Sequence, residues 1–359
     1  MFYHLLYPLH TQVSFFNLFQ YITFRTIYAG LTAFLICFLL GRPVIRLLAQ
    51  KQVGQYIRKL GPESHQGKAG TPTMGGILIV MSILASCLLW ANLSNRYVWI
   101  ALLATVGYAG IGFVDDYLMQ IRKRNRGLSG ATKFLLQVVI ALVVCMLIIA
   151  ESGFNTSLVV PFFKHVTPDL GIYYLIFGVF IVVGASNAVN LTDGLDGLVA
   201  GPLVMSFVAY MVFAYVAGNV IFSDYLQIRH VAGSGEVTVF CGATAGALVG
   251  FLWFNAYPAQ IFMGDVGSLP LGGALGTVAV ITRQEIILAL VGGIFVLETL
   301  SVIMQVVFFK ATNGKRIFRM APLHHHFELK GWEEPKIIVR FWIIALALAL
   351  LAVSTLKIR

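Results

Sequence analysis

Residues 132–150 read TKFLLQVVIALVVCMLIIA, a run with one charged side chain, Lys133, near its start. A helix rises about 1.5 Å per residue, so a run of this length crosses about 30 Å of hydrocarbon. Because lipid offers no partner for an unpaired backbone group, the run predicts a transmembrane helix. Similar runs occur at 22–40, 74–93, 97–113, 171–188, 198–216, 237–253, 261–281, 286–309 and 337–356. The sequence therefore predicts an all-α integral membrane protein with about ten transmembrane helices.

The composition supports a location in the bilayer. Of the 359 residues, 58% are hydrophobic and 11% are charged, and the mean hydropathy is +0.85. So few polar side chains cannot cover a water-soluble globule of this size. No internal repeat is evident, so we expect a single membrane domain over residues 1–359. The cysteines lack the spacing of a metal site and fall inside separate predicted helices, where we expect them to act as small packing residues: Cys37, Cys87, Cys145 and Cys241.

Positive charge distinguishes the two sides of the predicted bundle. If the chain crosses the membrane about ten times, alternate loops share one side. These loops are 41–72, 114–133, 187–197, 254–260 and 310–336, and with their borders they hold most of the 25 Lys and Arg residues. Cytoplasmic loops are enriched in Lys and Arg. We therefore expect this side to face the cytoplasm and both termini to face the periplasm.

Five aspartates lie on the same predicted cytoplasmic side, close to the ends of apolar runs: Asp115, Asp116, Asp193, Asp196 and Asp265. Ionisable groups at membrane depth are costly and indicate a functional site by default. They occur in three motifs, which read GFVDDY at 112–117, NAVNLTDGLDG at 187–197 and FMGDVGS at 262–268. Structural alternatives stay open: a solvated helix end for the first motif, a polar turn for the second and a helix cap for the third.

The last predicted cytoplasmic loop contains PLHHHFE at 322–328. Three consecutive His side chains cannot all ligate one ion from a regular helix, and no Cys accompanies them, so a structural zinc site is not expected. Imidazoles can instead bond phosphate oxygens, and a chance cluster in a basic loop is the alternative. A weaker signal is the Gly- and Pro-rich segment 61–76, in which Lys68, Thr71 and Thr73 are typical of a ligand-binding loop.

Aspartates gathered with His, Lys and Asn on one membrane face indicate Mg²⁺ and phosphate chemistry rather than a proton relay. Phosphoryl transfer depends mainly on charge neutralisation, which a divalent metal, Lys and His supply. A soluble anionic nucleotide cannot enter hydrocarbon, and a lipid phosphate cannot leave the interface. An enzyme that joins the two needs its site at the cytoplasmic boundary, where these acids are expected.

The motifs quoted above, together with Pro62-Glu63-Ser64-His65, resemble those of the phospho-N-acetylmuramoyl-pentapeptide-transferase family, within the polyprenyl-phosphate N-acetylhexosamine-1-phosphate transferase superfamily. The resemblance implies Mg²⁺-dependent transfer of phospho-N-acetylmuramoyl-pentapeptide from UDP-N-acetylmuramoyl-pentapeptide to undecaprenyl phosphate, giving lipid I and UMP. It also implies a homodimer in the bacterial inner membrane, with the active site formed by cytoplasmic loops and with no nucleic-acid partner.

The resemblance further implies roles for individual residues. Asp265 is expected to bind the metal, and the expected catalytic residues are Asp115, Asp116, Asp265 and His324. The expected substrate-binding residues are Lys68, Thr73, Lys133, Asn187, Asn190, Asp193, Gly194, Leu195, Asp196, Asn255, Phe262, His325 and His326.

Two other functions stay open at this stage. A sister enzyme transfers N-acetylglucosamine-1-phosphate to the same lipid and shares the acidic motifs, although the three uninterrupted His favour the muramoyl donor. A cation-coupled transporter would place ionisable residues near the bilayer midplane and on both faces, and only Glu298 lies well inside a predicted span. For the transfer itself we expect direct attack by the lipid phosphate over a phospho-aspartyl enzyme, because a phosphate monoester is mostly dianionic at about pH 7.

Overall fold

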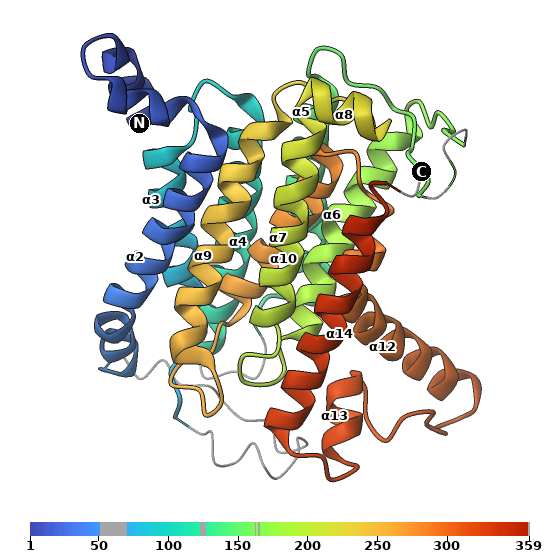
Figure 1. Ribbon diagram of the computed structural model, residues 1–359. Helices are drawn as coiled ribbons and strands as arrows, with labels where there is room; N and C mark the ends of the chain where they lie inside the picture. Colours follow the sequence, from blue (N-terminus) through green and yellow to red (C-terminus); the bar gives the residue numbers. More distant parts are fainter. Residues whose placement is uncertain (51–69, 123–126, 162, 164–165, 358–359) are drawn as a thin grey trace.

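The computed structural model describes residues 1–50, 70–122, 127–161, 163 and 166–357 (Figure 1). Over these ranges the chain is helical, with an isolated β-bridge between Ser157 and Asp169 and no strand. The chain begins with α1 (Phe2–Leu6) and two short 3₁₀ helices, Tyr7–Thr11 and Ser14–Gln20. The helices that follow are α2 (Ile22–Gln50), α3 (Gly76–Trp90), α4 (Arg96–Arg122), α5 (Gly130–Ile149), α6 (Tyr173–Thr192), α7 (Ala200–Ala217), α8 (Val220–Leu226), α9 (Val237–Asn255), α10 (Asp265–Ile281), α11 (Leu288–Val291), α12 (Gly293–Ala311), α13 (Leu323–Glu328) and α14 (Glu334–Ser354).

Within the described part of the chain, 8 helices are long and apolar enough to cross a membrane, namely α2, α4, α5, α6, α7, α9, α12 and α14. Two shorter apolar helices, α3 and α10, stand among them. Each predicted apolar run overlaps one of these helices, which confirms an all-helical, multi-pass membrane protein over the described residues. In Figure 1 both chain ends lie toward the upper end of the bundle, whereas α13 lies at the lower end.

Glycines let the central helices approach one another closely. Gly246 of α9 lies against α2, where an added Cβ would be 2.0 Å from the backbone oxygen of Gly30. Gly276 of α10 lies against α6, where an added Cβ would be 2.8 Å from Val182 Cα. In lipid, such small-residue faces drive helix association through van der Waals contact. Because α10 contacts α3, α4, α5, α6 and α7, it lies in the middle of the bundle.

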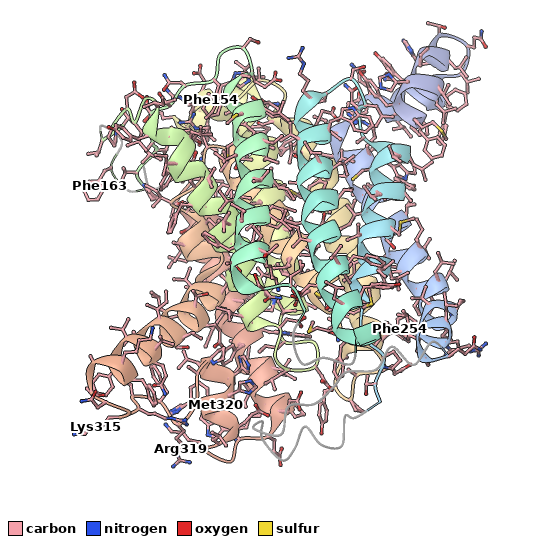
Figure 2. The ribbon with its side chains drawn as sticks, turned by 180° about the vertical axis from the view of Figure 1, so that it is seen from behind. Phe154, Phe163, Phe254, Lys315, Arg319 and Met320 are labelled. Carbon is pink, nitrogen blue, oxygen red and sulfur yellow. The ribbon has the colours of Figure 1, made fainter. Side chains whose placement is uncertain are left out.

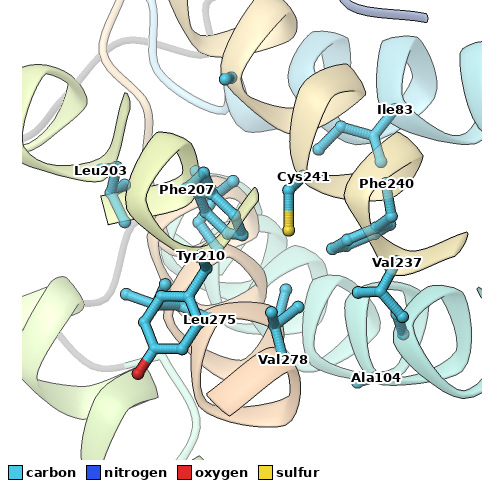
Figure 3. Packing of buried hydrophobic residues seen from close by; sticks show 14 of the residues in the cluster. Ile83, Ala104, Leu203, Phe207, Tyr210, Val237, Phe240, Cys241, Leu275 and Val278 are labelled. Carbon is cyan, nitrogen blue, oxygen red and sulfur yellow. The ribbon is translucent and has the colours of Figure 1, made fainter. Parts of the chain in front are cut away.

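The core between α7, α9 and α10 is apolar. Phe207 and Tyr210 of α7 lie beside Cys241 of α9 (Figure 3). Leu275 and Val278 of α10 complete this cluster. All four cysteines are buried and free of disulfides, which confirms that they pack as small apolar side chains.

Two helices continue past their predicted apolar runs into the acidic motifs. The run 97–113 was expected to stop before the acidic pair, but α4 continues to Arg122, so Asp115 and Asp116 are helical. The run 171–188 likewise continues as α6 to Thr192. Hydropathy indicates where the lipid-facing part of a helix ends, whereas the backbone hydrogen bonds of a helix continue through polar residues that find partners on neighbouring helices.

The predicted span 286–309 is not a single helix. α11 ends at Val291, and α12 begins at Gly293 after Gly292. Glycine is weak in a helix interior, and an added Cβ on Gly293 would be only 2.7 Å from Leu348 Cδ1 of α14. The two glycines therefore permit a break where the chain passes α14. Beyond the break α12 leans away from the bundle (Figure 1), and Figure 2 shows the loop after it, with Lys315 and Arg319 at the same end as Phe254.

Candidate active site

Asp265 is the first residue of α10 and belongs to a polar cluster contributed by several helices. Gly264 before it has φ of 72°, a left-handed conformation that favours glycine. The Asp265 carboxylate accepts a hydrogen bond from Asn190 Nδ2 of α6 at 2.7 Å and contacts the ammonium of Lys133 from α5. Asn190 also bonds Ser268 Oγ at 2.8 Å. Because its oxygens meet side chains of other helices, Asp265 is more than a helix cap.

The acidic pair of α4 faces two different partners, as expected for successive helical residues that point about 100° apart. Asp115 accepts a hydrogen bond from the backbone N–H of Leu128 at 2.6 Å and lies 3.3 Å from Lys133 Nζ. Asp116 accepts from the backbone N–H of Val266 at 3.0 Å, so a carboxylate of α4 caps α10. Both carboxylates are buried. The interpretation of this motif as a solvated helix end is therefore wrong.

This arrangement depends on close approach of two backbones. An added Cβ on Gly112 of α4 would be 2.2 Å from the backbone oxygen of Asp265, and one on Gly264 would be 2.7 Å from Asp116 Oδ2. Backbone atoms cannot move aside as a flexible side chain can. A larger residue at position 112 would therefore push α4 away from α10 and draw the acidic pair out of reach.

Asp193 adds a carboxylate immediately after α6. Burial, together with the negative charges of Asp265 and Asp116, raises the pKa of Asp193 to about 8. Lys133 contributes a positive charge between two of the acids. Negative charge exceeds positive charge among these side chains, so the cluster favours binding of a cation.

Asp196 and Asn255 join the loops around the cluster. Asp196 Oδ2 accepts from the backbone N–H of Ala259 at 2.9 Å. Asn255 donates to the backbone oxygen of Ile261 at 2.8 Å, and its buried Oδ1 has no hydrogen-bond partner among the described residues. That oxygen is an acceptor available to a ligand.

Phe262 and Thr73 lie where the chain before α3 meets the turn before α10. The backbone N–H of Phe262 donates to Pro72 O at 2.8 Å. Thr73 is buried, and its Oγ1 lies 3.2 Å from the position of a Cβ on Gly264. The structure thus brings the 70–76 segment, predicted as a ligand loop, beside Asp265.

Two predicted substrate-binding residues, Asn187 and Leu195, have partners other than the acids. Asn187 donates to Gln137 Oε1 at 2.7 Å and to Val183 O at 2.9 Å, one helical turn away from Asn190. Leu195 is buried in an apolar cluster with residues of α12 and α14. Lys68 lies outside the described residues. Their roles in substrate binding stay predictions.

The three histidines have separate environments. His324 is buried against Gly194, where an added Cβ would be 2.2 Å from His324 Nε2. His325 Nδ1 is 2.7 Å from Glu328 Oε2. His326 Nδ1 accepts from the backbone N–H of Arg319 at 3.1 Å. His324 therefore lies against the 187–197 motif, and its catalytic role stays a prediction.

Two polar residues at the site were not assigned from the sequence. Gln137 is buried on α5 four residues after Lys133, and therefore on the same helix face. In the sequence, Gln137 is marked only as a single amide side chain inside the apolar run 132–150. Glu298, noted above only as an ionisable residue inside a predicted span, bonds His324, which lies too far along the chain for any local pattern to reveal.

The residues present fit Mg²⁺. This ion prefers carboxylate oxygens, usually takes one or two of them, and fills the remaining positions with water and substrate phosphate. Asp265, with Asp116 and Asp193 nearby, supplies such oxygens in a cluster with excess negative charge. Within the described ranges, no group of three or more His, Cys, Asp and Glu side chains is arranged as a metal site.

A multi-pass helical bundle with acids, an amide and a lysine gathered at helix ends defines a membrane-embedded enzyme acting on phosphorylated substrates. Residues 98–283 match the Glycosyl transferase family 4. Residues 68–80 match the phospho-N-acetylmuramoyl-pentapeptide-transferase signature 1.

Full-length relatives specify the family. Proteins named phospho-N-acetylmuramoyl-pentapeptide-transferase from Desulfosudis oleivorans, Desulforapulum autotrophicum and Syntrophus aciditrophicus are 77%, 62% and 62% identical to this chain over 359 residues, the whole of each protein. The chain therefore belongs to the phospho-N-acetylmuramoyl-pentapeptide-transferase family.

Proposed function

We propose that this protein transfers phospho-N-acetylmuramoyl-pentapeptide from UDP-N-acetylmuramoyl-pentapeptide to undecaprenyl phosphate, giving lipid I and UMP for peptidoglycan synthesis. The observation that carries the proposal is the contact of Lys133 with both Asp115 and Asp265, because it joins α4, α5 and α10 at one polar site. Such a site at helix ends suits a reaction between a lipid phosphate and a soluble nucleotide.

The transfer needs charge neutralisation more than acid–base chemistry. An oxygen of the lipid phosphate bonds to the phosphorus that carries the sugar, and the bond from that phosphorus to the oxygen shared with UMP breaks. The attacking monoester has a second pKa of about 6, so at neutral pH it is already nucleophilic. Lys133 stabilises the negative charge of the phosphates, while Asn190 holds Asp265 in place. Phosphate trapped on an aspartate in the absence of the lipid acceptor would contradict direct attack.

We propose Mg²⁺ as the cofactor, with Asp265 as its protein ligand. Bound there, the ion would neutralise charge on the pyrophosphate of the nucleotide. Asn190 and Lys133 fix the orientation of the Asp265 carboxylate, and they would hold it ready for the ion. The excess negative charge around Asp193 supports this assignment.

We further propose ten transmembrane helices in the bacterial inner membrane, with α3 and α10 as the two short spans. The short spans are about 22 and 26 Å long at 1.5 Å per residue. Both chain ends lie toward one end of the bundle, which supports an even number of crossings with both termini periplasmic (Figure 1). The basic loops at the other end support a cytoplasmic active site. Homodimer formation is proposed from family membership.

The two alternative functions are less well supported. The full-length relatives carry the name of the muramoyl-pentapeptide transferase, which favours that donor over UDP-N-acetylglucosamine. For a transporter, the buried ions would line a pathway. The buried Arg25 instead forms a bidentate pair with Glu236, and Arg283 is paired with Glu285, arrangements typical of structural ion pairs.

UMP release by the purified protein in detergent tests the proposal. Undecaprenyl phosphate would be supplied with either UDP-N-acetylmuramoyl-pentapeptide or UDP-N-acetylglucosamine, first with Mg²⁺ and then with a chelator. We expect turnover of the first donor alone, lost on chelation and restored by added Mg²⁺. Turnover of the second donor alone would assign the chain to the sister activity, and turnover of neither by folded protein would refute the proposal.

A further inference from the structure

Glu298 is fully buried in the second turn of α12, and three N–H groups converge on its carboxylate. Oε2 accepts from the backbone N–H of Leu323 at 2.6 Å. Oε1 lies 3.2 Å from the backbone nitrogen of His324 and 3.2 Å from its Nδ1. Three donors around two oxygens are the environment of an ionised carboxylate, which can only accept. Glu298 therefore bonds both the backbone and the imidazole of the same residue.

These contacts determine which nitrogen of His324 is available. Because Glu298 accepts, Nδ1 must carry a hydrogen, and the neutral ring then has an unprotonated Nε2. Nε2 is buried and has no hydrogen-bond partner among the described residues. It lies against Gly194, since an added Cβ there would be 2.2 Å away. A nitrogen in this position costs free energy unless a ligand completes its hydrogen bonding.

The surroundings of Nε2 indicate where that ligand would bind. Gly194 lies between Asp193 and Asp196 in the polar motif that joins α6 and α7, and the negative charge of Asp265 helps to raise the pKa of Asp193. The absence of a side chain at Gly194 is required for the ring to lie there, because a Cβ would overlap the imidazole. The ring therefore faces the end of the site occupied by the Asp193 turn.

We propose that Glu298 is a positioning residue that fixes the tautomer and orientation of His324, so that Nε2 accepts a hydrogen bond from a hydroxyl or N–H group of the sugar nucleotide bound at the Asp193–Asp196 turn. The inference rests on the proposed function, because it takes the sugar nucleotide as the ligand. Glu298 acts through His324 and does not itself touch the substrate. Removing a carboxylate that orients a working imidazole typically lowers activity about 10- to 100-fold.

A double-mutant cycle on kcat/KM for UMP release tests this role. Glu298→Gln keeps the volume of the side chain, but its single carbonyl oxygen cannot serve all three N–H groups. We expect it to lower kcat/KM about 10- to 100-fold in the wild-type background, and by less than about twofold when His324→Ala is already present. The same substitution combined with His325→Ala should keep its full effect, because His325 Nδ1 is bonded to Glu328 Oε2.

The controls distinguish positioning from loss of the loop structure. Gln305 on the same helix accepts the backbone N–H groups of Ile317 and Phe318, and it contacts neither of the two histidines in the cycle. Gln305→Leu should therefore have the same effect with and without His324→Ala. If Glu298→Gln unfolds the protein by thermal melting, Glu298→Asp, which keeps the charge on a shorter side chain, takes its place in the cycle.

Each outcome bears on a different claim. If Glu298→Gln lowers kcat/KM equally with and without His324, or if its effect depends equally on His324 and His325, the positioning role is overturned. In either case, turnover by the wild type leaves the proposed function intact. Loss of wild-type turnover itself would refute the proposed function first. Coupling to His324 alone would support the inference.

Discussion

Replacing Lys133 with methionine removes the ammonium between two carboxylates and leaves the aliphatic part of the side chain in place. Nζ lies 3.3 Å from Asp115 Oδ2 and also contacts Asp265, and the Lys133 and Asp115 side chains are 19% and 8% exposed. At an effective dielectric constant of about 20, a charge pair at this separation is worth about 5 kcal/mol before desolvation is counted. Desolvation offsets part of that attraction, so the net loss is about 2–4 kcal/mol.

If this loss falls on the transition state, where the phosphates carry the most charge, each 1.36 kcal/mol is about a factor of ten in rate. We therefore expect Lys133→Met to lower kcat/KM for UMP release about 30- to 1,000-fold. Lys310→Met is the matched control, because it removes an exposed lysine at the end of α12 and should change turnover by less than about twofold. Retention of more than about one third of wild-type turnover by Lys133→Met, or an equal loss in the control, would refute the reasoning.

Three further predictions concern the backbone contact, the acid of α4 and the last histidine. Gly112→Ala places a methyl group against the backbone of α10, so it should lower both the melting temperature and turnover and reduce the free energy of unfolding by about 1–3 kcal/mol. Gly110→Ala is the control. Its added methyl group meets nothing within 4 Å, so the melting temperature should be unchanged or higher and turnover should be unchanged. Asp116→Asn keeps an acceptor for the N-terminus of α10 but removes the negative charge. UMP release should therefore fall about 100-fold or more, while the melting temperature changes little. A variant with nearly wild-type turnover would contradict a catalytic role for Asp116. Partial burial and nearby positive charges lower the pKa of His326, so the stability it contributes is present above pH about 6.5 and is lost as pH falls through the lower folded value. The melting temperature of the wild type should therefore fall more than that of His326→Gln between about pH 7.5 and 5.5, because glutamine still accepts the Arg319 N–H, and parallel curves would contradict this.

The helical fold could be predicted because lipid imposes one requirement on every span. Each crossing segment must be apolar and must satisfy its own backbone, so the sequence shows where the helices are. It shows less well where they end. The extension of α4 to Arg122 depends on partners for Asp115 and Asp116 that come from other parts of the chain. The break at Gly292 likewise depends on contact with α14, and hydropathy alone carries no such information.

The site was predictable as a set of residue types on one side of the membrane, but its pairings were not. The Lys and Arg residues of the loops predicted that the aspartates lie on the cytoplasmic side of the membrane. The structure brings Asp115, Asp116 and Asp265 together. Two partners came from apolar runs where a single polar residue gives a weak signal: Gln137 in α5 and Glu298 in α12. Their roles follow from contacts between residues distant in sequence, which a single sequence does not encode in any local pattern.

The position of Asp116 explains why the acidic site and the fold cannot be separated. The first N–H groups of α10 are buried within the bundle, where an unsatisfied donor is costly. Asp116 of α4 satisfies one of them at Val266 and at the same time places its negative charge beside the Asp265 turn. The close approach that permits this depends on Gly112 and Gly264. Alanine at position 116 would therefore remove a helix cap as well as a charge, and its lost activity would not identify a catalytic role. Asparagine keeps the cap, so a loss of turnover in that variant can be assigned to the charge.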